Sequence, residues 1–201
     1  MRQTCQRCGK AEKACICQWI QSVDTKTELL VLQHPSEVNR AIGTARILDL
    51  SLDNCQLIVG ENFTDNERLN QALRRSDIQW FVLYPGESAK PASALLADVA
   101  EKPIGFILLD GTWKKAFKIW QLSTNLHALP TCLLDNADEG QYQIRKSSKQ
   151  QGVSTVEAGY FALKAMEPDN QALDSLLVPF EKMIAFQIAQ MPDGVFKKNY
   201  L

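Results

Sequence analysis

Short apolar runs alternate with amphipathic segments along most of the chain. Short runs bounded by turn residues are typical of buried strands, whereas apolar residues three or four positions apart indicate helices. The runs expected as strands are residues 28–33, 55–59, 80–83 and 104–109, with a fifth inside 127–134. The segments expected as helices are residues 38–49, a short one behind Thr64, 91–100, one after Thr112, 154–166 and 180–190. This alternation predicts an α/β fold with a parallel sheet covered on both faces.

The rest of the chain is organised around residues 105–120, GFILLDGTWKKAFKIW. Asp110 and Gly111 end the most apolar run, and both tolerate the backbone conformations that end strands. Thr112 is suited to cap the next helix. The apolar positions of that helix share one face and are Trp113, Ala116, Phe117 and Trp120. Asp110 is therefore expected at the carboxyl end of a central strand, where α/β sheets bind ligands and where a helix dipole favours the ionised carboxylate. An ordinary strand-to-helix turn explains the same residues.

Two of the expected helices begin with the capping-box pattern S/T-x-x-E. Thr64 and Glu67 form the first box, and Ser154 and Glu157 form the second. The second box follows a polar segment, residues 141–152, that carries Arg145, Lys146 and Lys149 without any acid. We expect this segment to be an exposed loop.

The composition is ordinary for a globular protein. The chain has 201 residues, 45% of them apolar, and a formal net charge of −1. Such a charge argues against indiscriminate nucleic-acid binding but allows a local basic patch. No apolar run is long enough to span a membrane and no signal-peptide core is present, so the cytoplasm is the expected location.

Four of the six cysteines lie in the first 17 residues, with the spacing C-x2-C-x6-C-x-C. Clustered thiols in a reducing compartment indicate a metal site, and four thiolates suit a closed, structural zinc site. The expected ligands are Cys5, Cys8, Cys15 and Cys17. An iron–sulfur cluster or a redox pair remains an alternative. Cys55 and Cys132 lie in apolar runs and are expected in the core. We therefore predict a zinc-binding module at 1–24 and a main domain at 25–201.

The order of these motifs resembles one family, the DTW-domain proteins. The resemblance is carried by the four cysteines and by the segments LQHPSEVNRAIGTARIL, LLDGTWKKAFKIW and YQIRKSSKQQGVSTVEA, with Asp110, Thr112 and Trp113 as the family's D-x-T-W. It covers the chain from Cys5 to about Leu163. One departure is the pair Ile42-Gly43, where a polar Asn is expected before Thr44.

The resemblance implies a tRNA-uridine aminocarboxypropyltransferase. Such enzymes move the 3-amino-3-carboxypropyl group of S-adenosylmethionine to N3 of a uridine, here one in the variable loop of tRNA, and release 5′-methylthioadenosine. The resemblance also implies a SPOUT-like fold in which a C-terminal knot holds the S-adenosylmethionine. Neither the oligomeric state nor the tRNAs modified follow from the sequence.

Within this resemblance Asp110 is expected as the general base for the uridine N3 proton, or alternatively as the ligand of the donor's ammonium group. The residues expected to bind S-adenosylmethionine are Leu109, Gly111, Thr112, Trp113, Leu133, Ser154, Thr155 and Glu157. The residues expected to face tRNA are His34, Glu37, Arg40, Arg46, Arg145 and Lys146. Trp113 suits stacking on a base, but a plain core position explains it equally well.

Two other functions fit the same residues. An RNA methyltransferase that uses S-adenosylmethionine differs only in which carbon is transferred, and its by-product would be S-adenosylhomocysteine. A zinc-containing RNA-binding protein without catalysis is the second alternative, and saturable binding of S-adenosylmethionine would count against it.

Overall fold

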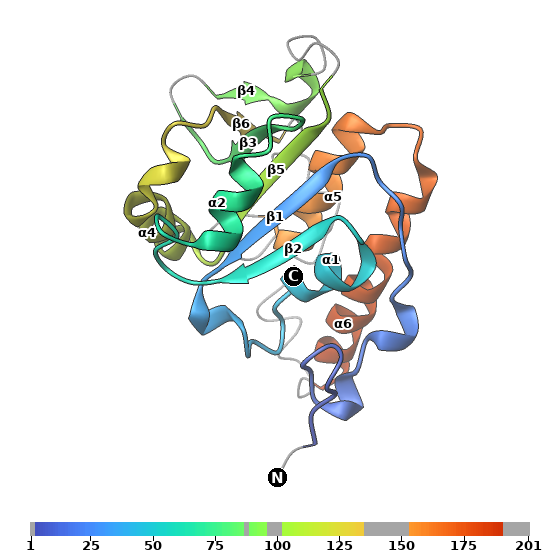
Figure 1. The fold of residues 1–201 in the computed structure, drawn as a ribbon. Coiled ribbons are helices and arrows are strands. Elements are labelled where there is room, and N and C mark those ends of the chain that lie inside the picture. Colours follow the sequence, from blue (N-terminus) through green and yellow to red (C-terminus); the bar gives the residue numbers. More distant parts are fainter. Residues whose placement is uncertain (1–2, 87–88, 96–101, 135–152, 191–201) are drawn as a thin grey trace.

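The computed structural model describes residues 3–86, 89–95, 102–134 and 153–190. Its centre is a six-stranded sheet in which every pair of neighbouring strands is parallel, in the order β2-β1-β5-β3-β6-β4 (Figure 1). The strands are β1 (Glu28–Gln33), β2 (Cys55–Val59), β3 (Gln79–Leu83), β4 (Lys90–Pro91), β5 (Ile104–Asp110) and β6 (Thr131–Leu133). The predicted parallel sheet is thus confirmed.

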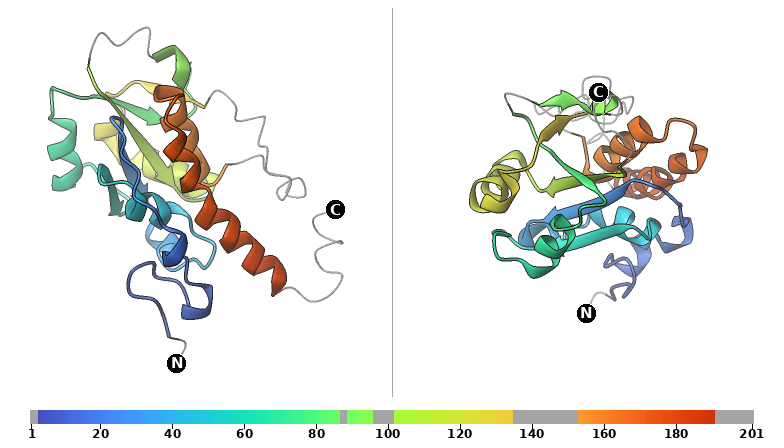
Figure 2. Two further views of the ribbon diagram at one scale, coloured as in Figure 1. Left: turned by 90° about the vertical axis from the view of Figure 1, so that its right-hand side faces the viewer. Right: turned by 45° about the horizontal axis from the view of Figure 1, so that its top comes forward.

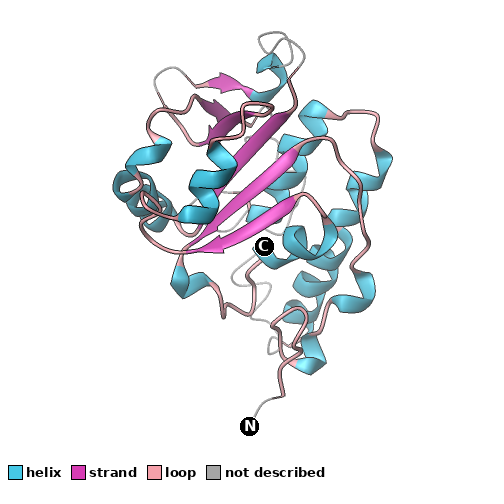
Figure 3. Ribbon diagram, viewed as in Figure 1, coloured by secondary structure: helices cyan, strands magenta, loops and turns pink. Residues whose placement is uncertain are grey.

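Helices cover both faces of this sheet, as Figures 2 and 3 show. One apolar cluster joins β1 to α2 (Glu67–Leu73) and α4 (Trp113–Leu122). The other joins β1 and β5 to α1 (Ala45–Ser51), α5 (Thr155–Met166) and α6 (Val178–Ala189). Alternate residues of β1 enter the two clusters, because successive side chains of a strand point to opposite faces. No helix among the described residues is both long enough and apolar enough to cross a membrane.

The central strand β5 is buried along almost its whole length. Its Gly105 lies beside Trp80 of β3, and a Cβ atom there would stand 2.4 Å from the Trp80 ring. Since that distance is far below van der Waals contact, only glycine fits. Trp80 itself is 2% exposed, and its indole N–H donates to the Ala72 carbonyl of α2. This packing fixes β5 between β1 and β3.

The helix predicted over residues 38–49 is shorter than expected. The short 3-10 helix η3 (Pro35–Glu37) and a series of turns precede α1, which begins only at Ala45. Val38 and Ile42 are 47% and 55% exposed. Their helical spacing was therefore misleading, because these apolar residues do not face the core. Similarly, residues 90–94 form β4 and a 3-10 helix, η4 (Ala92–Ala94), rather than the start of a longer helix, and 96–101 lie outside the described residues.

Two predicted helix caps are also wrong in detail. Helix α2 is capped by Asn66, whose side chain accepts from the Leu69 amide, while the Thr64 hydroxyl donates to the Leu122 carbonyl. Asn is the stronger cap and lies directly before the helix, so it displaces Thr64. Thr112 does occupy the N-cap position of α4, but its side chain makes no capping hydrogen bond. By contrast, the Ser154–Glu157 capping box is present in full.

The N-terminal segment contains two short 3-10 helices, η1 (Glu12–Ala14) and η2 (Cys17–Trp19). Cys8, Ile16 and Val23 enter the same apolar cluster as β1, α5 and α6. The boundary at residue 24 stays a prediction. The expected knot depends on the path of the chain between β6 and α5, and residues 135–152 lie outside the described residues.

Candidate functional site

A cavity of about 720 Å³ opens at the carboxyl edge of the sheet. This volume lies in the range of small-molecule sites. The walls come from the ends of β3, β5 and β6, the turns before α1 and the starts of α4 and α5. The lining residues are Glu37, Arg40, Ile42, Gly43, Thr44, Leu83, Tyr84, Pro85, Leu108, Leu109, Asp110, Gly111, Thr112, Trp113, Ala116, Cys132, Leu133, Leu134, Val153, Ser154, Thr155 and Ala158.

Most of the predicted ligand-binding residues lie around this one cavity. Asp110 lines it together with seven of the eight residues expected to bind the donor and with two expected to face tRNA. These are Leu109, Gly111, Thr112, Trp113, Leu133, Ser154, Thr155, Glu37 and Arg40. Their roles remain predictions, but the sheet brings segments together that are separated by more than a hundred residues of chain.

Asp110 is held by a donor on each side of its carboxylate. Gln33 Nε2 donates to Oδ2 at 2.7 Å, and the Thr155 hydroxyl donates to Oδ1. Gln33 is the register partner of Asp110 in the neighbouring strand β1, and Thr155 is the first residue of α5. Asp110 is only 7% exposed. The carboxylate is thus oriented by two separate elements and is largely shielded from water.

Burial raises the pKa of Asp110 above its ordinary value. The hydrogen bonds from Thr155 and Gln33 lower this pKa, the nearby carboxylate of Glu37 raises it, and the ammonium of Lys115 lowers it. The net shift is opposite to the one expected from a helix dipole alone, because the loss of hydration of the charged form outweighs the donors around it. A carboxyl group with a raised pKa is a stronger base once it is ionised.

A pair of opposite charges stands beside Asp110. Lys115 Nζ of α4 lies 2.5 Å from Glu37 Oε1, and Arg40 Nε lies 3.2 Å from Glu37 Oε2. The side chains of Lys115 and Glu37 are 25% and 13% exposed, so this pair is partly withdrawn from water. The sequence did not single out Lys115, since nothing local links it to Glu37. The cavity wall therefore carries Glu37 and Arg40 close to the buried carboxylate of Asp110, while Lys115, which does not line the cavity, pairs with Glu37.

The start of α5 forms another part of the cavity wall. The Ser154 hydroxyl accepts from the Glu157 amide, and Glu157 accepts from the Ser154 amide at 2.6 Å. The Val156 amide donates to Thr44 Oγ1 at 3.2 Å. These contacts occupy two of the first amides of the helix, which are the groups that would otherwise receive an anion. Glu157 is 4% exposed and completes the cap without lining the cavity.

Helix α4 turns two of its large apolar side chains, Trp113 and Phe117, outward. Trp113 and Phe117 are 55% and 54% exposed, whereas Ala116 and Ile119 are buried. The interpretation of Trp113 as a core residue is therefore wrong, since the helix packs on the core through Ile119 and the partly buried Trp120 instead. Trp113 lines the cavity, and Phe117 lies one helical turn further along the same exposed side.

Two predicted residues point elsewhere, although they lie close by in the chain. His34 follows β1, and its Nε2 lies 2.8 Å from Glu61 Oε1 while its Nδ1 accepts from the Ser36 amide. Arg46 pairs with Asp49 at 2.9 Å and donates to the Arg7 carbonyl. Neither lines the cavity. Arg145 and Lys146 lie outside the described residues, as does Lys149.

Sequence reasoning missed several residues of this site. Gln33 ends β1 and reaches Asp110 only through the register between β1 and β5, which the local sequence does not reveal. Thr44, Tyr84 and Cys132 reach the cavity from three different elements, and Cys132 lines it although it is fully buried, as expected of a core residue. A signal was available for Gln33, Thr44 and Tyr84, because each lies at or just beyond the carboxyl end of a strand or directly before a helix, where ligands bind.

The four N-terminal cysteines form a second site, separate from the cavity. Their sulfurs all lie within 4.8 Å of one another, with Cys5 Sγ 3.6 Å from Cys17 Sγ and Cys8 Sγ 3.8 Å from Cys15 Sγ. Sulfurs at the corners of a tetrahedral zinc site lie about 3.8 Å apart, given Zn–S bonds of about 2.3 Å. All four thiols are free of disulfides. The donor set and its spacing therefore fit a metal ion.

The pKa values of these thiols also suit a metal ligand set. Amide hydrogen bonds from Cys8 and Arg7 lower the pKa of Cys5 to about 6, whereas burial raises that of Cys17 to about 12. The Cys5 thiolate thus forms readily, whereas Cys17 needs a cation to compensate its charge. A bound divalent metal would provide it.

The fold and its sites define an α/β protein with a ligand-sized cavity at the carboxyl edge of a parallel sheet and a four-cysteine cluster that can bind a metal. Residues 2–188 match the family model described as "DTW domain". The chain therefore belongs to the DTW domain family.

Its curated relatives carry consistent names. The chain is 28% identical over 204 residues to "tRNA-uridine aminocarboxypropyltransferase 2" of Mus musculus, covering 100% of this chain and 68% of the mouse protein. It is 28% identical to the protein of the same name from Drosophila melanogaster, covering 93% of this chain and 76% of the fly protein. It is 25% identical to "tRNA-uridine aminocarboxypropyltransferase A" of Arabidopsis thaliana, covering 92% of this chain and 81% of the plant protein. No solved structure shows significant similarity to this chain.

Proposed function

We propose that this protein is a tRNA-uridine aminocarboxypropyltransferase that uses S-adenosylmethionine as donor. The names of its relatives support the reaction class. The observation that carries the proposal for this chain is the buried carboxylate of Asp110, which is oriented by two donors at the wall of a cavity large enough for the donor. The family resemblance further supports a SPOUT-like class for the fold, with a variable-loop uridine as target.

The reaction forms a bond between uridine N3 and the methylene carbon of the donor and breaks the bond from that carbon to the sulfonium. The sulfur keeps the electron pair and leaves as the neutral thioether 5′-methylthioadenosine. The N3 proton has to be accepted as the nitrogen attacks. Asp110 is the base that the cavity offers, and its raised pKa strengthens it for this task.

Much of the remaining catalysis is positioning, because the sulfonium carries three carbons and only one is transferred. Orientation of this kind can supply roughly 7–11 kcal/mol of the barrier. The transferred group carries both an ammonium and a carboxylate. Glu37 suits the ammonium and Arg40 suits the carboxylate, since both line the cavity, and Lys115 holds Glu37 through its ion pair. Binding of the ammonium by Asp110 itself is the alternative role.

The mouth of the cavity suits an RNA loop. Trp113 and Phe117 expose aromatic surface on which bases can stack. Three lysines accompany them on α4, Lys114, Lys115 and Lys118, and the helix has no acid. Among the described residues Lys114 has no ion-pair partner. Arg145 and Lys146 remain predicted phosphate contacts, and His34 and Arg46 are left with indirect roles in this proposal.

Zinc is the metal we propose for Cys5, Cys8, Cys15 and Cys17. The spacing of the sulfurs supports it, and four protein thiolates leave no open position for a substrate. The role of the metal is accordingly structural, within a module that we place at residues 1–24. Free thiols of this kind persist in a reducing compartment such as the cytoplasm.

The test is mass spectrometry of nucleosides from unmodified tRNA incubated with the protein and S-adenosylmethionine. The expected products are an aminocarboxypropylated uridine and 5′-methylthioadenosine. S-adenosylhomocysteine together with a methylated nucleoside would show the alternative, an RNA methyltransferase. Tight tRNA binding without any consumption of the donor would show the non-catalytic alternative and refute the proposal.

A further inference from the structure

The four-cysteine cluster and the cavity are connected by one buried side chain, Lys10. This lysine lies between Cys8 and Cys15 in the chain and is 6% exposed. Its Nζ donates to the carbonyls of Ala41, at 2.8 Å, and of Gly43, at 3.0 Å. A lysine is almost never buried unless its ammonium is paired, so this burial signals a specific contact rather than a chance position.

The backbone of Lys10 is set by the turn that the cysteines form. The Cys5 amide donates to the Lys10 carbonyl at 2.8 Å, and the Gly9 amide donates to the Cys5 carbonyl at 2.9 Å. Gly9 has a φ of +73°, a conformation that favours glycine. An ion that gathers Cys5 and Cys8 would therefore hold this turn and, with it, the point from which the Lys10 side chain extends.

The other end of the contact is the wall of the cavity. Arg40, Ile42, Gly43 and Thr44 all line it, and Ala41 lies among them. These residues form turns rather than a helix, so few backbone hydrogen bonds of their own hold them. Thr44 in turn accepts from the Val156 amide at the start of α5. Lys10 thus reaches the segment that closes the cavity on the side facing Ser154 and Thr155.

We propose that Lys10 is a positioning residue that holds residues 40–44 in the conformation that binds the donor, so that metal occupancy of the cysteine cluster and donor affinity are coupled. Lys10 touches no substrate in this proposal and acts through the backbone of Ala41 and Gly43. The predicted effect on donor affinity rests on the proposed function, whereas the predicted effect on the conformation of residues 40–44 does not.

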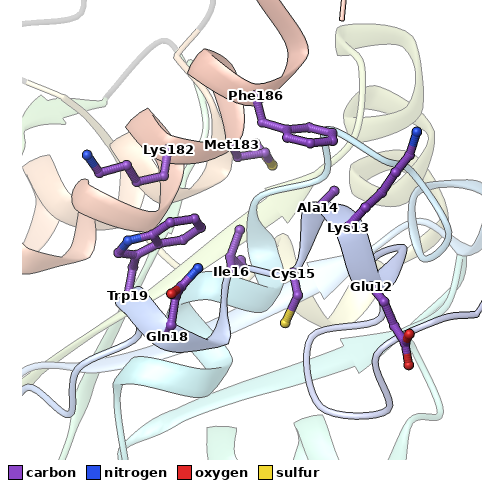
Figure 4. Close-up of a pocket in the computed structure, with 10 residues that line it drawn as sticks. All are labelled: Glu12, Lys13, Ala14, Cys15, Ile16, Gln18, Trp19, Lys182, Met183 and Phe186. Atoms are coloured by element: carbon purple, nitrogen blue, oxygen red, sulfur yellow. The ribbon is translucent and has the colours of Figure 1, made fainter. Parts of the chain in front are cut away.

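The test compares Lys10→Met with Lys13→Met. Methionine keeps most of the apolar stem of Lys10 and removes the ammonium. Lys13 lies in the same module but is exposed, and in Figure 4 its side chain points away from the Cys15 sulfur. It borders a pocket of about 170 Å³ between η1, η2 and α6, which is smaller than most ligand sites. Lys13→Met is therefore a matched control outside the contact with residues 41–43.

The first measurement is amide hydrogen exchange of zinc-loaded protein without donor or tRNA. Lys10→Met is expected to speed exchange in residues 40–44, with β1 and β5 unchanged and the metal content equal to that of the wild type. Lys13→Met is expected to change none of these. Unchanged exchange of residues 40–44 in Lys10→Met would overturn the proposal. If Lys10→Met fails to fold, chelation of zinc from the wild type tests the same segment, with β1 and β5 again reporting the intact sheet.

The coupling between the metal and residues 40–44 is tested by combining zinc chelation with Lys10→Met. Chelation is expected to speed exchange of residues 40–44 in the wild type and to add little in Lys10→Met, because the connection is already cut. An equal effect of chelation in both proteins would show that the metal acts by another route, and the proposal would fall.

Calorimetry with S-adenosylmethionine then measures the functional consequence. Lys10→Met is expected to raise the dissociation constant about tenfold, the order of one lost hydrogen bond to a charged group, and Lys13→Met to leave it unchanged. Equal affinities of wild type and Lys10→Met would refute the link to the donor site. A wild type that binds no donor would instead refute the proposed function, while the exchange experiment would still decide the role of Lys10.

Discussion

Gln33 donates a hydrogen bond of 2.7 Å to the carboxylate of Asp110 from the neighbouring strand of the sheet. The two residues end β1 and β5 in register, and Thr155 donates to the other carboxylate oxygen from α5. Asp110 is therefore fixed in position before any ligand arrives.

Replacing Asp110 by Asn should lower the rate of transfer about 100-fold or more, because Asn fills the same space but accepts no proton. The pH profile distinguishes the two roles of Asp110. With Asp110 as base, the wild-type rate rises with pH through a pKa above the ordinary Asp value, and the variant lacks this limb. Asp77 is exposed and serves as the control: Asp77→Asn should keep both the wild-type rate and the acidic limb of the pH profile. Full recovery of Asp110→Asn at saturating donor would instead assign Asp110 to donor binding.

The same substitution should raise stability at neutral pH. The pKa of Asp110 is higher in the folded than in the unfolded chain, so the folded state holds its proton longer as pH rises. The free energy of unfolding therefore falls as pH increases from the ordinary Asp pKa through the raised one. Asp110→Asn removes this fall, which urea titrations at several pH values would measure. Asp77 has a lowered pKa because Arg75 pairs with it, so Asp77→Asn gives no stabilisation. A less stable Asp110→Asn at pH 7 would contradict the argument.

Lys115→Met should weaken donor binding by about tenfold or more, since it leaves the largely buried Glu37 with only the more exposed Arg40 as a partner. It should also move the acidic limb of the pH profile upward, because the ammonium of Lys115 lowers the pKa of Asp110. Lys114→Met is the matched control on the same helix, and its donor affinity should stay at the wild-type value. Isothermal titration measures the donor affinity, and pH–rate profiles measure the position of the acidic limb. A limb at the wild-type pH would show that Lys115 does not influence the pKa of Asp110.

Trp113→Ala should weaken tRNA binding by about 1–3 kcal/mol if a base stacks on the exposed indole. The dependence of affinity on salt should persist, because no phosphate contact is lost. Leu122→Ala removes another partly exposed apolar side chain of α4 and should leave tRNA affinity unchanged. Filter binding at several salt concentrations would show this. Loss of donor affinity with intact tRNA binding would place Trp113 against the donor instead.

Metal analysis of freshly purified protein should give about one zinc per chain, as a closed four-thiolate site requires. Cys8→Ser should reduce the zinc content and lower the unfolding temperature, since Cys8 is both a ligand and part of the apolar cluster. Cys55→Ala changes a buried residue of the edge strand β2 that is not one of the four clustered cysteines, so it should retain the metal. Iron in place of zinc would show that the four cysteines hold an iron–sulfur cluster instead.

Local patterns predicted five of the six strands, all except β4, and the position of Asp110, because short apolar runs and turn residues are read within a few positions of the chain. They failed where long-range packing decides. Val38 and Ile42 have the spacing of a core-facing helix but are exposed before α1, and Trp113 has that spacing but faces outward. The pairs Glu37–Lys115 and Lys10–Gly43 join residues far apart in the chain, so no local signal announces them.

The position of β5 has a consequence for the growing chain. This strand lies between β1 and β3, both of which are synthesised before it, and it carries Asp110 at its end. Until β5 emerges, β1 and β3 each present an unpaired edge, and exposed edges of apolar strands promote aggregation. A nascent chain that stops before residue 104 therefore leaves a gap at the centre of its sheet. Joining of β1 to β3 through β5 and delivery of the carboxylate are the same event, so a chain that has not yet inserted β5 lacks the carboxylate on which the site depends.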